Sequence, residues 1–271
     1  MQLKRNLRMS ILAGILFGLC ITILEIHPVG NMIYLSDLIM QLSGSKGRFV
    51  LACSAPELLD FFFLQIPANA MILISGRKMY QHFCVASAYV FYRCEDRVSW
   101  YLRQCKDLFI EILAFEIMYL ASIIVVCSVR YQLIWDGKGF VILVTQILLY
   151  ASWIYFGSIL VNILSLSFGS STGYMIFIIV ESVFISILCI LYPLPNSPLK
   201  TIFLNIDPIS HLVLGWQTSH IIGDFGKSDI VSISCMVSIL YETLALICII
   251  LFGMKKTLHQ EIIVNNHETD N

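Results

Sequence analysis

The side chains best placed to do chemistry are four acidic residues within long apolar stretches. Glu111 and Glu116 share one stretch, whereas Glu181 and Glu242 belong to two others. If these stretches cross a bilayer, a charge at its centre costs about 2.5–3.5 kcal/mol on insertion scales, so each carboxyl is expected to face protein or water. Glu116, Glu181 and the amide of Asn162 are candidates to line a substrate path. The alternative is that they make structural polar contacts between helices.

The spacing of the polar residues argues against catalysis. Two helical residues five positions apart lie about 140° apart around the axis, so Glu111 and Glu116 are poorly placed to act together. The sequence has no phosphate-binding loop of the GxxxxGKS/T type, no HExxH, no GxSxG and no Cys/His pair with zinc spacing. The nine cysteines are scattered and form no CxxC pair, which is typical of small apolar residues. We therefore expect no catalytic residue, no metal site and no directly bound cofactor.

The composition indicates the solvent in which these residues must work. The chain has 271 residues, of which 58% are apolar and 13% charged, and its mean hydropathy is +0.82. Soluble domains average about 25% charged residues, so a soluble enzyme and a disordered chain are both excluded. The net charge of −1 gives no basic field for nucleic acid. The sequence predicts a polytopic membrane protein.

Six stretches are long and apolar enough to cross a membrane as helices, which takes about 20 residues. The expected spans are 9–25, 58–76, 107–128, 140–164, 174–192 and 230–252. The second contains Asp60, Pro67 and Asn69, which predicts a kinked or partly re-entrant helix. The first lacks a small-x-small cleavage site and is expected to stay uncleaved. The predicted fold is therefore all-α, a single transmembrane domain over 1–271.

The distribution of Lys and Arg predicts the orientation. With the N-terminus inside, the cytoplasmic segments carry 11 basic residues and the outer segments carry 6. Positive residues favour the cytoplasmic side, so both termini are expected there. The segment 77–106 is then cytoplasmic, and the segment 193–229 is extracellular.

The cytoplasmic segment contains a predicted amphipathic helix over 94–106. Its apolar face consists of Val98, Tyr101, Leu102 and Cys105. Its other faces carry charges of both signs, so the helix could lie on anionic lipid, with its Trp at the interface, or dock onto a cytoplasmic partner. The candidate docking residues are Glu95, Asp96, Arg97, Trp100 and Arg103.

The outer segment predicts a helix too short to span the bilayer. Pro193, Pro195 and Pro198 interrupt the preceding helix, and Asp207-Pro208 is a helix start signal. Apolar residues follow as far as Gly223. This helix is expected to dip into the outer leaflet as a re-entrant half-helix hairpin before the sixth span.

This layout resembles the permeases of the ABC transporter type 2, or exporter-type, family. Six spans, a basic amphipathic helix between the second and third, and a Pro-rich outer hairpin before the sixth carry the resemblance. The patterns Tyr89-Val90-Phe91-Tyr92-Arg93, Ser99-Trp100-Tyr101 and Lys106 are similar to the coupling-helix segment of small bacterial members. One departure is that the amphipathic helix expected before the first span is only about eight residues long here.

The resemblance implies a multi-pass permease subunit of a bacterial cell membrane, without ATPase activity of its own. Two permease chains, identical or different, would pair with two cytoplasmic ABC ATPase subunits that bind ATP and Mg²⁺. The segment 94–106 would sit in a cleft of the ATPase, and membrane lipids would surround the spans. The substrate would be an exported peptide, antibiotic or lipid-like molecule. The alternatives are a stand-alone immunity or secretion-accessory protein without an ATPase, and an intramembrane enzyme.

Overall fold

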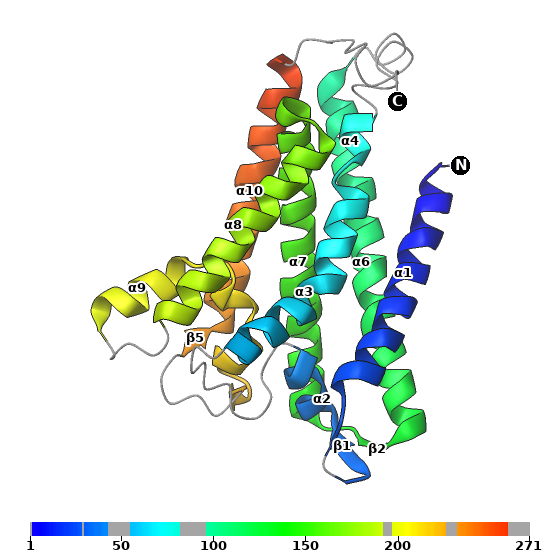
Figure 1. The fold of residues 1–271 in the computed structure, drawn as a ribbon, viewed down its shortest axis with the longest axis vertical. Helices are drawn as coiled ribbons and strands as arrows, with labels where there is room; N and C mark the ends of the chain where they lie inside the picture. The colour runs from blue at the N-terminus through cyan, green and yellow to red at the C-terminus, as the bar shows by residue number, and fades with distance from the viewer. Residues whose placement is uncertain are drawn as a thin grey trace.

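A computed structural model describes residues 2–28, 30–42, 55–81, 96–191, 197–225 and 232–259. Long helices dominate this part of the chain: α1 (Gln2–Glu25), α3 (Ala55–Ser75), α6 (Arg97–Arg130), α7 (Gly137–Phe168), α8 (Ser170–Leu191) and α10 (Cys235–His259). They form one bundle in which successive helices run in opposite directions (Figure 1). We call the end where α1 begins and α10 finishes the terminal end.

Five of these helices are long and apolar enough to cross a membrane: Arg5–Glu25, Arg97–Arg130, Gly137–Phe168, Ser170–Leu188 and Cys235–Leu258. Their outward-facing surfaces are apolar as well. In α10, for example, only 17% of the most apolar stretch is buried inside the protein, so most of its apolar residues face outward. Water would not cover such a surface favourably, whereas lipid does. The chain is therefore a helical, multi-pass membrane protein. The helix α3 passes through the same bundle with Pro67 in its interior.

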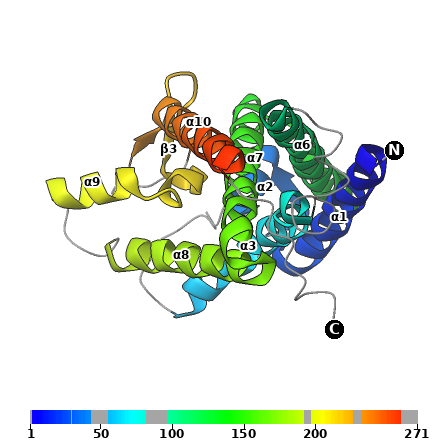
Figure 2. The ribbon, with the colours of Figure 1, turned by 90° about the horizontal axis from the view of Figure 1, so that it is seen from above.

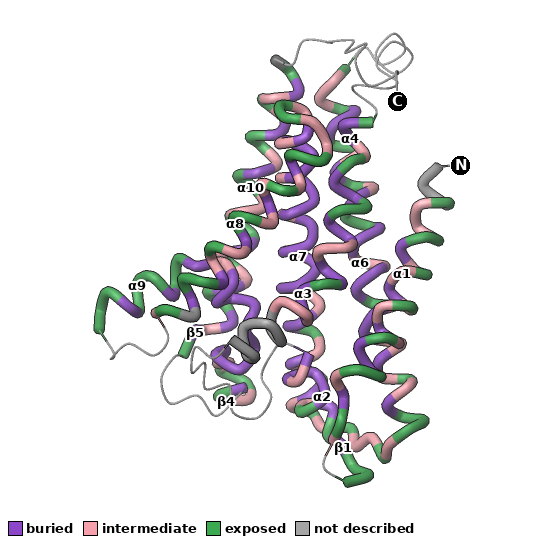
Figure 3. The backbone as a smooth tube through the Cα atoms, in the orientation of Figure 1, coloured by how far each residue is buried: buried purple, intermediate pink, exposed green. Residues whose placement is uncertain are grey.

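The helix α7 is the centre of the bundle (Figure 2). It packs against α3, α6, α8 and α10, and 67% of its most apolar part is buried, against 28% for α8. Figure 3 shows this burial along most of its length. Its sequence is apolar on every side, which suits a helix surrounded by other helices. Side chains on α7 therefore contact helices on several sides of the bundle.

The end opposite the terminal end is closed by short elements. The strand β1 (Met32–Tyr34) pairs in parallel with β2 (Gln132–Ile134), and α2 (Leu35–Leu42) packs against α7. The Asp136 carboxylate is the N-cap of α7, accepting the Gly139 amide at 3.0 Å, and it also accepts the Ser36 amide at 3.1 Å. This one carboxylate therefore joins the start of α7 to α2.

The segment 77–106, predicted to be cytoplasmic, differs in structure from its prediction. The helix α6 begins at Arg97, with Asp96 as N-cap, and continues without interruption to Arg130. Residues 97–106 are thus the first turns of a long helix rather than a separate surface helix. The short α4 (Lys78–Tyr80) follows α3, and 82–95, including Glu95, lie outside the described residues.

The predicted apolar face of this segment is partly wrong. Tyr101 and Cys105 are buried as expected, but Leu102 is 45% exposed, and Trp100, expected at the interface, is buried. The buried face of these turns differs from the predicted one because α6 packs along α7 and α10 instead of lying flat on a bilayer surface.

The segment 193–229, predicted to be extracellular, also differs from its prediction. The helix α9 spans Pro198–Ile206, with Ser197 as N-cap and Pro198 in its first turn. Asp207 ends this helix, and its carboxylate accepts the Ile209 amide at 2.8 Å. Pro198 begins a helix here because its missing N–H is not needed in the first turn. The expected helix from Asp207 to Gly223 is not formed.

The chain after α9 consists of tight turns and short strands. These are the 3₁₀ turns η2 (Ser210–Leu212) and η3 (Leu214–Trp216) and the strands β3 (Gln217–Ser219), β4 (Gly223–Asp224) and β5 (Ile233–Ser234). β3 pairs antiparallel with β4 and parallel with β5. Leu212, Leu214 and Trp216 are at most 1% exposed, so the two 3₁₀ turns pack inside the protein, whereas β4 is exposed. Exposed apolar residues in this part of the chain lie mainly on α9, at Leu199, Ile202, Phe203 and Ile206, and Ile221 is exposed as well.

Candidate functional site

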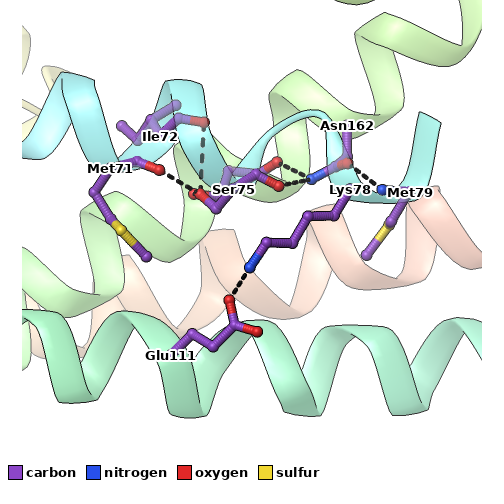
Figure 4. A network of polar contacts seen from close by, with 8 residues as sticks. Met71, Ile72, Ser75, Lys78, Met79, Glu111 and Asn162 are labelled. Carbon is purple, nitrogen blue, oxygen red and sulfur yellow. Dashed lines mark hydrogen bonds and ion pairs between the residues drawn. The ribbon is translucent and has the colours of Figure 1, made fainter. Parts of the chain in front are cut away.

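A network of buried polar groups joins α3, α4 and α7 near the terminal end (Figure 4). The Asn162 amide nitrogen donates to the carbonyl oxygens of Ser75 at 3.1 Å and Ser158 at 2.8 Å. Its amide oxygen accepts the Met79 backbone N–H at 2.8 Å. The Ser75 and Ser158 hydroxyls are 2.6 Å apart. Asn162 is fully buried, and its amide clamps α7 to the junction between α3 and α4.

An ion pair lies beside this network. Lys78 of α4 contacts the Glu111 carboxylate of α6, and Glu111 is only 2% exposed. Burial lowers the pKa of Lys78 to about 8, although the Asp107 carboxylate opposes this shift. Lys78 therefore remains mostly protonated at neutral pH, and its charge compensates that of Glu111. The pair joins α4 to α6 in the way that Asn162 joins it to α7.

The ion pair faces a polar cavity of about 310 Å³ between α1, α3, α4, α6 and α7. Its polar lining consists of Arg5, Asn6, Ser10, Lys78, Gln81, Gln104, Asp107, Glu111 and Asn162. Charges of both signs are present, so the lining does not favour an anion over a cation. The cavity is suited to water and small polar solutes entering from the terminal end.

A second polar cluster surrounds Glu116 at the interface of α3, α6 and α7. Glu116 is 1% exposed and lies close enough to Tyr119 and Tyr150 to interact electrostatically with both. The Gln65 amide nitrogen lies 3.5 Å from the Tyr150 hydroxyl. One oxygen each of Glu116, Gln65 and Gln146 has no hydrogen-bond partner.

Glu181 joins α8 to α3. The Asn69 amide nitrogen donates to one Glu181 carboxylate oxygen at 2.8 Å, and the Tyr174 hydroxyl donates to the Asn69 carbonyl oxygen at 3.2 Å. The other Glu181 oxygen is buried without a partner. Glu181 is 2% exposed, so it lies inside the protein.

The three candidate path residues do not form a single site. Glu116 and Glu181 both lie near Tyr150, whereas Asn162 is twelve residues further along α7, which corresponds to about 18 Å. Lys78 and Tyr150 were not singled out in the sequence. In a sequence, a lysine just beyond an apolar stretch looks like any other basic residue that follows the positive-inside rule. Its pairing with Glu111 can therefore be recognised only once the fold is known.

The candidate docking residues occupy the start of α6. Asp96 is exposed, and hydrogen bonds from the Ser99 hydroxyl and the Val98 amide lower its pKa. Arg103 is exposed, Arg97 is half-buried and Trp100 is buried. Of the predicted set that the structure describes, Asp96 and Arg103 are thus the most accessible to a partner.

The first turns of α6 are held firmly to the bundle. The Tyr155 hydroxyl of α7 donates to the Cys105 carbonyl oxygen at 3.0 Å. Tyr101 packs on Gly253 of α10 so closely that a Cβ there would lie 2.8 Å from its ring carbon Cζ. This end of α6 is therefore fixed to two helices.

Replacing Asn162 with Leu is expected to lower stability by about 1–3 kcal/mol, because the Met79 amide and the Ser75 carbonyl lose buried partners. Unfolding of the detergent-solubilised protein would measure this. Gln132→Leu, at an exposed amide on β2, is the matched control and should change stability by less than about 0.5 kcal/mol. If both substitutions lowered the stability equally, Asn162 would not clamp α7 to the junction between α3 and α4.

Among the described residues, no group of three or more His, Cys, Asp or Glu side chains could hold a metal ion. No protein-family model matches the chain, and no curated protein or solved structure matches it.

Proposed function

We propose that the chain is the permease subunit of an ATP-driven exporter of the ABC type, working with a separate ATPase subunit. In this proposal α1, α3, α6, α7, α8 and α10 are six spans, and the terminal end is cytoplasmic. The helix α9, with its exposed apolar residues, takes the place of the outer half-helix. The substrate is a peptide, antibiotic or lipid-like molecule. Two such chains, identical or different, pair with two ATPases that bind ATP and Mg²⁺.

The observation that carries the proposal is the length of α6. Its 34 residues extend about 51 Å, whereas the bilayer core is about 30 Å thick. The excess lies at the terminal end, where Arg103 and Lys106 are exposed. The same unbroken helix carries Glu111 and Glu116. A force applied to its exposed turns would therefore reach the buried polar groups directly.

The charges on these turns support a protein partner. Asp96, Arg103 and Lys106 are exposed and of mixed sign, whereas helices that bind only lipid are rich in Lys and Arg on the polar face. The fixed contacts of Tyr101 and Cys105 with α10 and α7 would transmit movement of this end to the bundle. These features suit coupling to an ATPase better than simple anchoring.

The direct test is charge reversal at the accessible turns. Arg103→Glu combined with Lys106→Glu is expected to weaken co-purification of the ATPase and to reduce export at least tenfold, while the permease still inserts. A single exposed pair contributes only about 0–1 kcal/mol, so both charges are changed. The control is Arg130→Glu, an exposed residue at the opposite end of the same helix.

A second experiment decides between the proposed permease and a stand-alone protein. Affinity purification from native membranes, followed by mass spectrometry, should recover a subunit with a Walker motif. If the wild-type chain recovers none, the stand-alone immunity or secretion-accessory function replaces the permease. If the double variant retains both ATPase and export, the coupling role of α6 is wrong.

The orientation is tested by labelling single cysteines in a cysteine-free background. Leu199 of α9 is 67% exposed and lies on the proposed outer side, so Leu199→Cys should react with an impermeant maleimide in intact cells. Lys106→Cys should react only after permeabilisation. The reverse pattern would show that the terminal end is outside and would remove the basis for an ATPase contact there.

A further inference from the structure

A second cavity, of about 270 Å³, lies between α7, α8, α10, the end of α9 and the turn that follows it. Its lining is almost entirely apolar and includes five aromatic rings: Trp153, Phe156, Phe177, Phe184 and Tyr241. Two carboxyl groups are the exceptions, Glu181 from α8 and Glu242 from α10. The helices α8 and α10 both pack on α7 and lie on separate sides of this part of the bundle (Figure 2).

Both carboxyl groups are buried and incompletely paired. Glu181 is 2% exposed and Glu242 is 3% exposed, and each has an oxygen without a hydrogen-bond partner. Glu181 accepts the Asn69 amide with its other oxygen, and the Trp153 indole is a second hydrogen-bonding neighbour of this carboxyl. A buried polar atom without a partner costs about 1–3 kcal/mol, more when it is charged. Carboxyl groups from two helices line one apolar cavity, and each keeps an oxygen without a fully formed hydrogen bond, which favours a further polar partner in the cavity.

The rest of the lining defines the chemistry of that partner. Among the described residues that line the cavity, none is basic, so an anion or a lipid phosphate would have no counter-charge. Aromatic faces attract cations, by about 0.5–2 kcal/mol each depending on desolvation. Carboxylates add charge-assisted hydrogen bonds or ion pairs. Carboxylates and rings both favour a positive charge carried on an apolar body.

The cavity also has an entrance for such a molecule. Val180 and Ile206, which line the cavity, are 43% and 58% exposed. Both are apolar and lie on the outer surface of the bundle, where lipid would cover them. An amphiphile could therefore enter from the bilayer with its charged group inward.

We propose that this cavity binds a hydrophobic cation, an ammonium group on an apolar body, between Glu181 and Glu242. The carboxylates neutralise the ammonium, and the aromatic rings enclose the apolar part. The binding site stands without any ATPase, so it does not depend on the proposed transport function. If the chain is a permease, this class of molecule is a candidate for its substrate.

The test uses two molecules of the same shape that differ in charge. Phenyltrimethylammonium and tert-butylbenzene are titrated into the full chain in phosphatidylglycerol nanodiscs, and binding is followed by saturation-transfer NMR. The cation is expected to bind at least tenfold more tightly than its neutral isostere. Equal affinity would overturn the proposal, because the cavity would then be only apolar, and absence of cation binding would overturn it as well.

Variants locate the site. Glu181→Gln and Glu242→Gln should each weaken cation binding at least tenfold while leaving tert-butylbenzene binding unchanged, which also shows that the cavity is still folded. Glu116→Gln, at a buried carboxyl outside this lining, should bind the cation as the wild type does. Cation binding that is insensitive to both cavity variants would overturn the proposal.

The ammonium group could belong to a free molecule or to a lipid. Repeating the titration with phosphatidylethanolamine in the nanodisc distinguishes them. Competition by this lipid would support the ammonium site and identify a lipid headgroup as its occupant. Unchanged affinity would support the site and identify a free cation.

Discussion

Replacing Lys78 with Met is expected to destabilise the protein by about 3 kcal/mol, the lower end of the cost of leaving one member of a buried ion pair without its partner, because Lys78 is 21% exposed and both residues line a polar cavity. Glu111 is 2% exposed and is compensated by Lys78. Met keeps much of the lysine's length but supplies no charge, so the carboxylate would have to be protonated or draw in water. Urea unfolding of the detergent-solubilised protein measures the loss.

A double variant separates charge from packing. Lys78→Met combined with Glu111→Leu removes both charges and should recover most of the loss, because replacing a whole buried pair by apolar residues is often neutral. Lys106→Met, at an exposed lysine on the same helix as Glu111, is the control and should stay within about 0.5 kcal/mol. A loss below about 1 kcal/mol in the single variant would contradict a compensated buried charge.

The long helices were predictable because their apolar residues extend over more than the width of a bilayer. Their ends were harder to predict. The helix α6 begins ten residues before the expected 107–128, and α7 begins three residues before the expected 140–164, since they start at capping carboxylates, Asp96 and Asp136, in polar sequence. A hydropathy pattern does not show where a helix is capped. An Asp before a helix is a recognised start signal and indicates the first residue better.

The error in the prediction for 193–229 has a different physical cause. Ser197-Pro198 and Asp207-Pro208 both resemble a helix start, and the first of them begins the helix that forms. Asp207 then bonds the Ile209 amide and makes a turn, as Asp side chains also do in loops. Local sequence cannot choose between two equal signals. The burial of the following residues against the bundle decides it.

The burial of the acidic residues was predictable, but their partners were not. Glu111, Glu116, Glu181 and Glu242 are all at most 3% exposed, as the cost of charge in lipid requires. The contacts of Glu111 with Lys78 and of Glu181 with Asn69 join residues 33 and 112 positions apart. Such contacts follow from which helices are neighbours, and that order is set by the packing of the whole bundle.

The second large effect is expected where α1 meets α6. Gly14 and Gly18 of α1 are four residues apart and face the α6 backbone: a Cβ on Gly14 would lie 2.5 Å from the Phe115 carbonyl oxygen, and one on Gly18 would lie 2.6 Å from the Tyr119 carbonyl oxygen. Small residues at this spacing allow helices in membranes to approach closely. Gly18→Val should therefore force α1 away from α6 and cost about 3 kcal/mol, at the upper end of typical overpacking.

The expected failure is local, because α1 is a peripheral helix whose most apolar part is only 28% buried. Fluorescence-detected size exclusion and melting in detergent should show a less stable protein that is still membrane-inserted. Leu16→Val, at a 61% exposed position on the same helix, is the control for adding a β-branched residue and should melt as the wild type does.

The cause of the loss can be assigned with a relieving substitution. The Cβ of Gly18→Ala would overlap the Ser122 hydroxyl as well as the Tyr119 carbonyl. Adding Ser122→Ala removes the side-chain overlap but leaves the backbone oxygen in place, so the double variant should recover only part of the stability lost in Gly18→Ala. Complete recovery would mean that the side chain alone limits the approach. No recovery would mean that the Ser122 hydroxyl has no part in the clash, so that only contact between the two backbones requires glycine here.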